Sequence, residues 1–168
     1  MSKFATLMRE ILDNSNHAQI SIAQAIETLK RYIELEELRI KKDVLFNIEL
    51  SKDISKENIL IPSMMIQPFI ENSIWHGLKN QDQPEIRLKF NIEDEYLYII
   101  IADNGTGFDT KLLDIKRVNP RGVNLVKERL ASLRKRTKLS KVGISVESNK
   151  NGTSVSIIVP LLNAYENE

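Results

Sequence analysis

Apolar residues follow two different spacings along the chain, and these separate helical from extended segments. Residues 2–14 and 22–40 carry apolar side chains at three- and four-residue intervals, the spacing of a helix with one buried face. Ser21 and Gln24 have the form of a capping box, in which two side chains satisfy free backbone N–H groups at a helix start. The first 40 residues are therefore predicted to form two helices.

Apolar residues at every second position predict strands at 44–50, 86–92, 142–146 and 155–159. The run 96–102 has no polar face, which is typical of a central strand covered on both sides. Residues 61–79 return to helical spacing, and Pro68 predicts an irregular first turn with a regular helix after it. A tight turn is predicted at Asn151 and Gly152, between the last two strands.

Residues 108–121 show no periodicity, which indicates a loop or lid longer than most connections. A helix is predicted to follow it, before the last two strands. Hairpins outnumber parallel crossovers in this order of elements. We therefore predict an α+β fold, a two-layer sandwich whose mixed, mostly antiparallel sheet carries helices on one face. Residues 1–40 are expected to form a helical segment, and residues 41–168 the main domain.

Composition narrows the possible functions. A formal net charge of +1 argues against a dedicated nucleic-acid binder, so no nucleic-acid partner is expected. The chain has no cysteine and two histidines, which excludes disulfides and leaves no plausible zinc cluster. Its longest apolar run, residues 96–102, is far too short to span a membrane. Motifs of P-loop nucleotide-binding proteins and of serine hydrolases are missing.

Two short segments carry the candidate chemistry. PFIENSIWHG places Asn72 and His76 four residues apart, on one face of a predicted helix. DNGTG places Asp103 at the end of a strand, directly before Gly105 and Gly107. A strand-end acid alone is more often a turn or capping residue, and a lone histidine is more often packed or solvent-facing. The combination of the two segments is what indicates a ligand site.

Five segments in this order resemble the GHKL superfamily of ATP-binding domains, and more closely the catalytic domains of sensor histidine kinases of the LytS type. They are LKRYIELEELRI, IPSMMIQPFIENSIWHG, DNGTGFD, RGVNLVKERL and NGTSVSIIVP. The resemblance implies a Bergerat-type ATP-binding fold, with ATP and Mg²⁺ as ligands.

The resemblance also implies a role for each matching residue. Asn72 would ligate Mg²⁺ through its amide oxygen, and His76 would donate a hydrogen bond to the phosphates. Asp103 would accept a hydrogen bond from the exocyclic amine of adenine. Gly105 and Gly107 would let the backbone lie against the base and the sugar.

Three further positions match the later motifs. Gly122 would allow the lid to close over phosphate, where the N–H groups of a helix start meet anionic oxygen. Arg121 would supply positive charge to the phosphates. Thr153 would lie near the adenine.

Two prolines depart from the superfamily pattern. Pro68 occupies the position at which superfamily ATPases carry a water-activating glutamate, which argues against efficient ATP hydrolysis. Glu71 is then the remaining candidate for a catalytic, polarising role. Pro120 replaces the first glycine of the second glycine box, and we expect it to stiffen the lid and weaken nucleotide retention.

The resemblance implies a protein histidine kinase that transfers the γ-phosphate of ATP to a histidine on an upstream dimerisation helix. His17 lacks the sequence context of such an acceptor, so the acceptor is expected outside this chain, which alone would not autophosphorylate. The expected partners are that helix, a response regulator and a second copy of the full-length protein. We expect a cytoplasmic domain of an inner-membrane sensor.

Two alternatives remain open. The first is a degenerate nucleotide-binding interaction module without kinase activity, which the altered second glycine box favours. The second is an anti-sigma-type protein serine kinase, which shares the fold.

Overall fold

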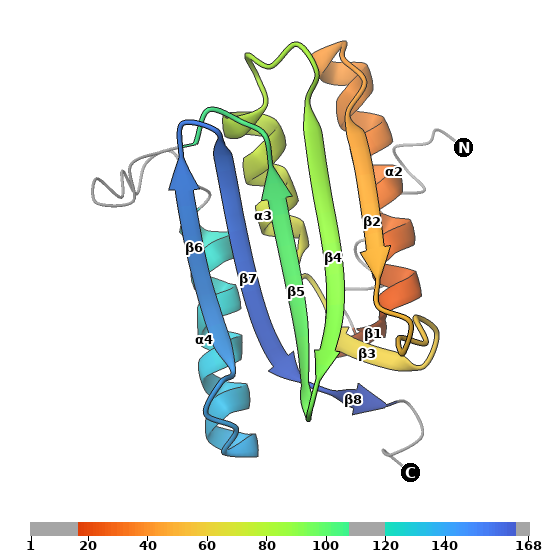
Figure 1. Cartoon of the computed structure of the whole chain (residues 1–168), viewed down its shortest axis with the longest axis vertical. Helices are drawn as coiled ribbons and strands as arrows, with labels where there is room; N and C mark the ends of the chain where they lie inside the picture. The colour runs from red at the N-terminus through yellow and green to blue at the C-terminus, as the bar shows by residue number, and fades with distance from the viewer. Residues whose placement is uncertain (1–16, 108–119, 164–168) are drawn as a thin grey trace.

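The structure, a computed structural model, describes residues 17–107 and 120–163 (Figure 1). The predicted helix at 2–14 and most of the predicted lid lie outside these residues. A five-stranded sheet has the order β2 (Leu45–Leu50), β4 (Glu85–Glu93), β5 (Tyr96–Asp103), β7 (Gly152–Pro160) and β6 (Gly143–Asn149). A smaller sheet has the order β1 (Gln19–Ser21), β3 (Ile59–Pro62) and β8 (Leu162–Asn163).

Every helix in the described ranges lies on one face of the five-stranded sheet (Figure 1). They are α2 (Ile22–Ile40), α3 (Gln67–Asn72), the π-helical turn η1 (Ser73–Gly77) and α4 (Pro120–Thr137). Strands β2 and β4 pair in parallel, and the other pairs of this sheet are antiparallel. The predicted fold class is thereby confirmed. None of these helices is long and apolar enough to cross a membrane.

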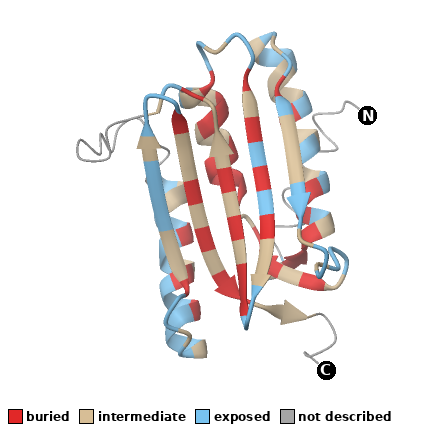
Figure 2. Cartoon of the chain, in the orientation of Figure 1, coloured by how far each residue is buried: buried red, intermediate tan, exposed pale blue. Residues whose placement is uncertain are grey.

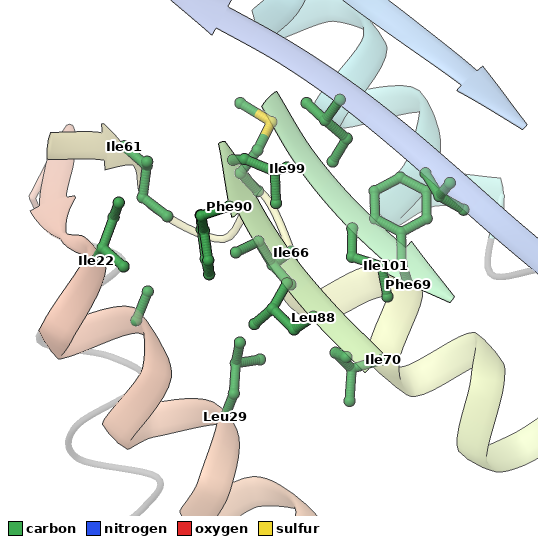
Figure 3. Packing of buried hydrophobic residues seen from close by; sticks show 14 of the residues in the cluster. Ile22, Leu29, Ile61, Ile66, Phe69, Ile70, Leu88, Phe90, Ile99 and Ile101 are labelled. Carbon is green, nitrogen blue, oxygen red and sulfur yellow. The ribbon is translucent and has the colours of Figure 1, made fainter. Parts of the chain in front are cut away.

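The hydrophobic core lies between the helices and the sheet (Figures 2 and 3). Alternate residues of β4 and β5, such as Leu88, Ile99 and Ile101, are buried there against α2 and α3. Each fully buried side chain of this kind contributes about 1.5–3 kcal/mol relative to an exposed one. Because side chains alternate between the faces of a strand, Asp103 follows Ile99 and Ile101 towards the helices.

The predicted capping box at the start of α2 is confirmed. The Gln24 backbone N–H donates to Ser21 Oγ at 3.1 Å, and the Ser21 N–H donates to Gln24 Oε1 at 2.9 Å. The helix ends at Lys41, which takes a left-handed conformation with φ 55°. Between these ends, one stripe of α2 is buried in the core, and its members are Ile22, Ala25, Ile26, Leu29 and Ile33.

Strand β5 is central in the sheet, as predicted, but the prediction that it is covered on both sides was wrong. Its helix-facing residues are buried, whereas Tyr98, Ile100 and Ala102 on the other face are only half-buried. No helix of the described ranges lies on that face (Figure 1). Cross-strand neighbours such as Lys89, which pairs with Ile100, partly shield these apolar side chains from water.

The helix predicted within residues 61–79 is shorter than expected. Strand β3 occupies its beginning, and regular helix extends only over α3 before the π-helical turn. Pro68 lies in the first turn of α3, where its missing N–H has no intrahelical partner to lose. The irregular part is instead η1, in which the Leu78 N–H donates to the Ser73 carbonyl at 2.8 Å, five residues back.

The tight turn between the last two strands was predicted one residue too late. Strand β6 ends at Asn149 and β7 begins at Gly152, so Lys150 and Asn151 form the turn. Gly152 is already paired in the sheet. It takes φ +136°, a conformation that side chains of L-residues rarely adopt.

Candidate functional site

The candidate site is built around Asp103, at the end of β5, and the α3–η1 segment packed beside it. Two residues of η1, Ser73 and Gly77, face Asp103. Ser73 Oγ donates to Asp103 Oδ2 at 2.7 Å, and Gly77 lies close enough that an added Cβ would be 3.2 Å from Oδ1. The chain thus brings its two candidate motifs together, since Ser73 directly follows Asn72.

The Asp103 carboxylate is fixed by hydrogen bonds from three different parts of the chain. Besides Ser73, the backbone N–H groups of Gly105 and Thr153 donate to Oδ1 at 2.9 and 3.3 Å. An ionised carboxylate offers about four acceptor positions. With two donors on Oδ1 and one on Oδ2, the described residues leave one acceptor position, on Oδ2.

The glycines of the turn after Asp103 are required by close contacts within the protein. A Cβ on Gly105 would lie 2.6 Å from the backbone of Gly77, and the next residue's N–H donates to the Gly77 carbonyl at 3.1 Å. Gly107 has φ +60°, and a Cβ there would lie 1.8 Å from the Asn149 carbonyl oxygen. Contact of either glycine with a nucleotide stays a prediction.

Asn104 joins the same turn to the start of β4. Its Oδ1 accepts the Glu85 N–H at 2.9 Å, and its Nδ2 donates to the Gln83 carbonyl at 2.8 Å. Its own N–H donates to the Glu85 carbonyl at 3.2 Å. The turn is therefore held on three sides, by η1, by β4 and by the β6–β7 hairpin.

The other predicted site residues differ in exposure. Asn72 is half-buried on α3, and His76 is exposed on η1. Thr153 is half-buried on β7, and its hydroxyl forms a 2.9 Å hydrogen bond with Ser148 Oγ. Arg121 is exposed in the first turn of α4, followed by half-buried Gly122.

Glu71 lies on another side of the α3–η1 segment. It accepts a 2.9 Å hydrogen bond from Gln67 Nε2, one turn earlier. Its charge also acts on Tyr32 and Glu36 of α2, which places it towards that helix. The α3–η1 segment thus has two different sides, one with Glu71 towards α2 and one with Ser73 towards Asp103 of β5.

Ser73 and Gly77 were not among the predicted site residues. Both stand in the motif ENSIWHG, four residues apart and directly after Asn72 and His76. This spacing was a signal that a second side of the same segment faces a partner. What the sequence alone did not reveal is that the partner is Asp103.

The two-layer arrangement, with the helices on one face of a mixed sheet, is the fold of histidine kinase domains of known structure. The histidine kinase AdeS of Acinetobacter baumannii superposes with a TM-score of 0.63 at 13% sequence identity, covering 95% of this chain and 77% of that one. At this identity the likeness concerns the fold alone.

In sequence, the chain is similar to sensor proteins. It is 28% identical to the sensor protein LytS of Staphylococcus epidermidis, over 98% of this chain and 28% of the relative. It is 25% identical to the sensor histidine kinase YesM of Bacillus subtilis, over 97% of this chain and 28% of the relative. No family profile matches the chain.

These similarities confirm the predicted resemblance to LytS-type sensor histidine kinases and to their catalytic-type domain. The chain spans about 28% of the length of the two relatives. The comparison therefore concerns only this part of each relative.

Proposed function

We propose that the chain is the ATP-binding catalytic domain of a two-component sensor histidine kinase. The observation that carries this proposal is the Asp103 carboxylate, held by three hydrogen bonds beside the segment that bears Asn72 and His76. A carboxylate fixed in this way is an anionic acceptor of defined direction. Its hydrogen-bond donor Ser73 directly follows Asn72, whose amide oxygen is suited to a metal ion.

Adenine fits the acceptor position left on Asp103 Oδ2. The exocyclic amine of adenine is a hydrogen-bond donor, whereas guanine has a carbonyl oxygen at the corresponding position. A carboxylate attracts the first and repels the second. The half-buried Thr153, whose N–H already holds Asp103, would lie beside the base.

Asn72 would hold the Mg²⁺ that accompanies the nucleotide. Within residues 17–107 and 120–163 there is no group of three His, Cys, Asp or Glu that could hold a metal ion. A nucleotide-borne Mg²⁺ fits this chain, because Mg²⁺ keeps several waters and needs only one or two protein oxygens besides the phosphates. When bound, the ion neutralises charge on the phosphate oxygens.

Other residues would contact the phosphates directly. His76 would donate a hydrogen bond, Arg121 would supply charge, and the N–H groups around Gly122 belong to a helix start, which favours anions. Glu71 would act as a polarising residue. Because Pro68 offers no carboxylate four residues before Asn72, the residues suit transfer to a positioned acceptor better than hydrolysis.

The acceptor would be a histidine on a dimerisation helix, supplied by another segment. From it the phosphoryl group would pass to a response regulator, and two copies of the full-length protein would pair. The domain would act on the cytoplasmic side of the inner membrane. These partners follow from the similarity to sensor kinases.

Calorimetric titration with a non-hydrolysable ATP analogue and Mg²⁺ tests the binding step. We expect micromolar to millimolar affinity for the adenine nucleotide and a clearly weaker signal with the matching guanine nucleotide. Equal affinity for both would refute the role of Asp103, and no heat with either would refute the site.

Radiolabel transfer from ATP tests the kinase step, in a protein that includes the phosphoacceptor segment. An acid-labile product on histidine is expected. An acid-stable product would instead support the serine kinase alternative.

The degenerate binding module is the alternative favoured by the altered second glycine box. Pro120 is the first residue of α4. Proline does not disrupt a helix there, because the N–H group that it lacks would have no intrahelical partner. Nucleotide binding without label transfer in the extended protein would select this alternative.

A further inference from the structure

The side of α3–η1 that faces away from Asp103 is fastened to α2. At one end of this contact, Lys42 Nζ donates to the carbonyl oxygens of Lys79 and Gln81, at 3.3 and 2.8 Å. At the other end, Glu71 acts electrostatically on Tyr32 of α2. Contacts from α2 and from the turn after it therefore meet this part of the chain both before and after η1.

Arg39 and Trp75 meet in the middle of this contact. The Arg39 guanidinium carbon lies 3.9 Å from the centroid of the Trp75 ring, a cation–π geometry. Tyr32 of α2 also interacts with Trp75, and burial raises the pKa of its hydroxyl. Trp75 is thus held on its α2 side by the Arg39 cation over its ring.

Arg39 also interacts electrostatically with Glu36 on its own helix. Glu36 Oε2 is buried and has no hydrogen-bond partner among the described residues. Burial raises the pKa of Glu36, the Arg39 charge opposes that rise, and the nearby Glu71 adds to it. Removing the Arg39 charge would take away the cation that favours the ionised form of Glu36 and leave the opposing effect of Glu71.

Trp75 belongs to the same irregular segment as the residues proposed to bind the metal ion and the phosphates. Trp75 and His76 are consecutive residues of the π-helical turn η1, and Asn72 is the last residue of α3, directly before it. A π-turn is less well packed than an α-helix and recurs at functional sites. The orientation of η1 therefore depends on contacts on both of its sides, from Ser73 to β5 and from Trp75 to α2.

We propose that Arg39 is a positioning residue, which holds Trp75 and thereby sets the orientation of Asn72 and His76 relative to Asp103. This inference rests on the proposed function. Of the three hydrogen bonds on the Asp103 carboxylate, the two on Oδ1 come from Gly105 and Thr153, outside the α3–η1 segment. The end of the site that would bind the base therefore depends less on Arg39 than the end that would bind the metal ion and the phosphates.

Arg39→Ala separates the two ends of the site. We expect the affinity for a non-hydrolysable Mg·ATP analogue to fall roughly two- to fivefold, the size of an exposed cation–π contact. The affinity for adenosine, measured by displacement calorimetry, should stay unchanged. Arg39→Lys keeps a cation and should recover part of the loss.

Arg31→Ala is the matched control, since it removes the same side chain from the same helix two turns earlier. Arg31 forms an exposed ion pair with Glu27 at 3.9 Å and lies outside the Trp75 contact. Its loss should leave both affinities unchanged. Trp75 is the only tryptophan of the chain, so its fluorescence reports directly whether each variant has altered the contact.

The outcomes separate this inference from the proposed function. If the unchanged protein binds neither ligand, the proposed function fails and Arg39 loses its role with it. If the unchanged protein binds both, two results would overturn the inference alone. One is a changed Trp75 emission in Arg39→Ala with an unchanged Mg·ATP affinity, and the other is an equal loss for adenosine and Mg·ATP.

Discussion

The two sides of the α3–η1 segment are held by different kinds of contact. Towards β5, Ser73 makes a 2.7 Å hydrogen bond to Asp103, and Gly77 approaches Gly105 with no room for a side chain between them. Towards α2, Trp75 is held by the long side chain of Arg39. Short bonds and backbone contacts fix one side, whereas long side chains that can adopt other rotamers hold the other.

This difference indicates that the base end is the rigid reference of the site and the α2 side is the adjustable one. Short charge-assisted hydrogen bonds define a direction as well as a distance. A cation over an aromatic ring tolerates sliding and tilting at a modest loss of free energy. Substitutions on the two sides should therefore differ in both size and kind of effect.

The largest effect is expected for Asp103→Asn, which should abolish measurable adenine-nucleotide binding, a loss of about 100-fold or more. The Asn oxygen would stay with the N–H groups of Gly105 and Thr153, because those can only donate. Its NH₂ group would then occupy the place of Oδ2 and donate to Ser73. An incoming amine would meet a donor instead of an acceptor.

Calorimetry with Mg·ATP measures this loss, and circular dichroism checks that the fold is retained. Asp82→Asn is the control, because it makes the same chemical change at an exposed position in a loop before β4. Unchanged affinity in Asp103→Asn would contradict the assignment of Asp103 to the base.

The next effect is expected on stability, for Gly105→Ala. The added Cβ would lie 2.6 Å from the Gly77 backbone, so η1 and the turn must move apart. We expect the free energy of unfolding to fall by about 1–3 kcal/mol, the usual range for overpacking. Urea denaturation followed by circular dichroism measures it.

Gly143→Ala is the matched control for this substitution. A Cβ on Gly143 would have the Lys141 carbonyl as its nearest neighbour, at 3.9 Å, which is ordinary contact. Equal stability losses in the two variants would show that the turn is not held rigidly against η1.

The smallest effect is expected on the α2 side, for Glu36→Gln. Burial raises the pKa of Glu36 above its usual value of 4.5, so folding favours the protonated form. Its contribution to stability is full below the unfolded pKa and is lost as the pH rises through the folded pKa. At pH 7 Glu36→Gln should therefore be slightly more stable than the unchanged protein, by about 0.5 kcal/mol or less.

This gain should disappear below about pH 4.5, where the carboxyl group is neutral in both states. Thermal unfolding across the pH range measures it. Glu34→Gln, at an exposed position of the same helix, is the control and should show no such pH-dependent gain. A gain of the same size at pH 3 and pH 7 would argue against a charge effect.

Sequence patterns predicted the elements with clear periodicity and missed those too short to have one. The capping box of α2 and the alternation in β4 were readable because each rests on local chemistry. Strand β3 was not, since its four residues merge with an apolar run that leads into α3. Strands β1 and β8, of three and two residues, offer no period at all.

The candidate site, too, could be predicted only where its residues stand in local sequence motifs. Asp103 and Asn72 stand in recognisable motifs, and the hydrogen bond from Ser73 to Asp103 joins these two motifs in the fold. The π-helical turn is not encoded in any one residue. It follows from fitting Gly77 against the turn after β5 and Trp75 against α2 at the same time, which is a property of the assembled fold.

The small sheet brings together two distant parts of the chain. Strands β1 and β8 pair with opposite edges of β3, Gln19 beside Pro62 and Asn163 beside Ile59. With neighbouring strands about 5 Å apart and a rise of about 3.3 Å per residue, Gln19 and Asn163 lie two strands apart across the sheet and three residues apart along it, roughly 14 Å from each other. Strand β3 thereby ties the segment that leads into α2 to the segment that follows β7, so a change in β3 would loosen both at once.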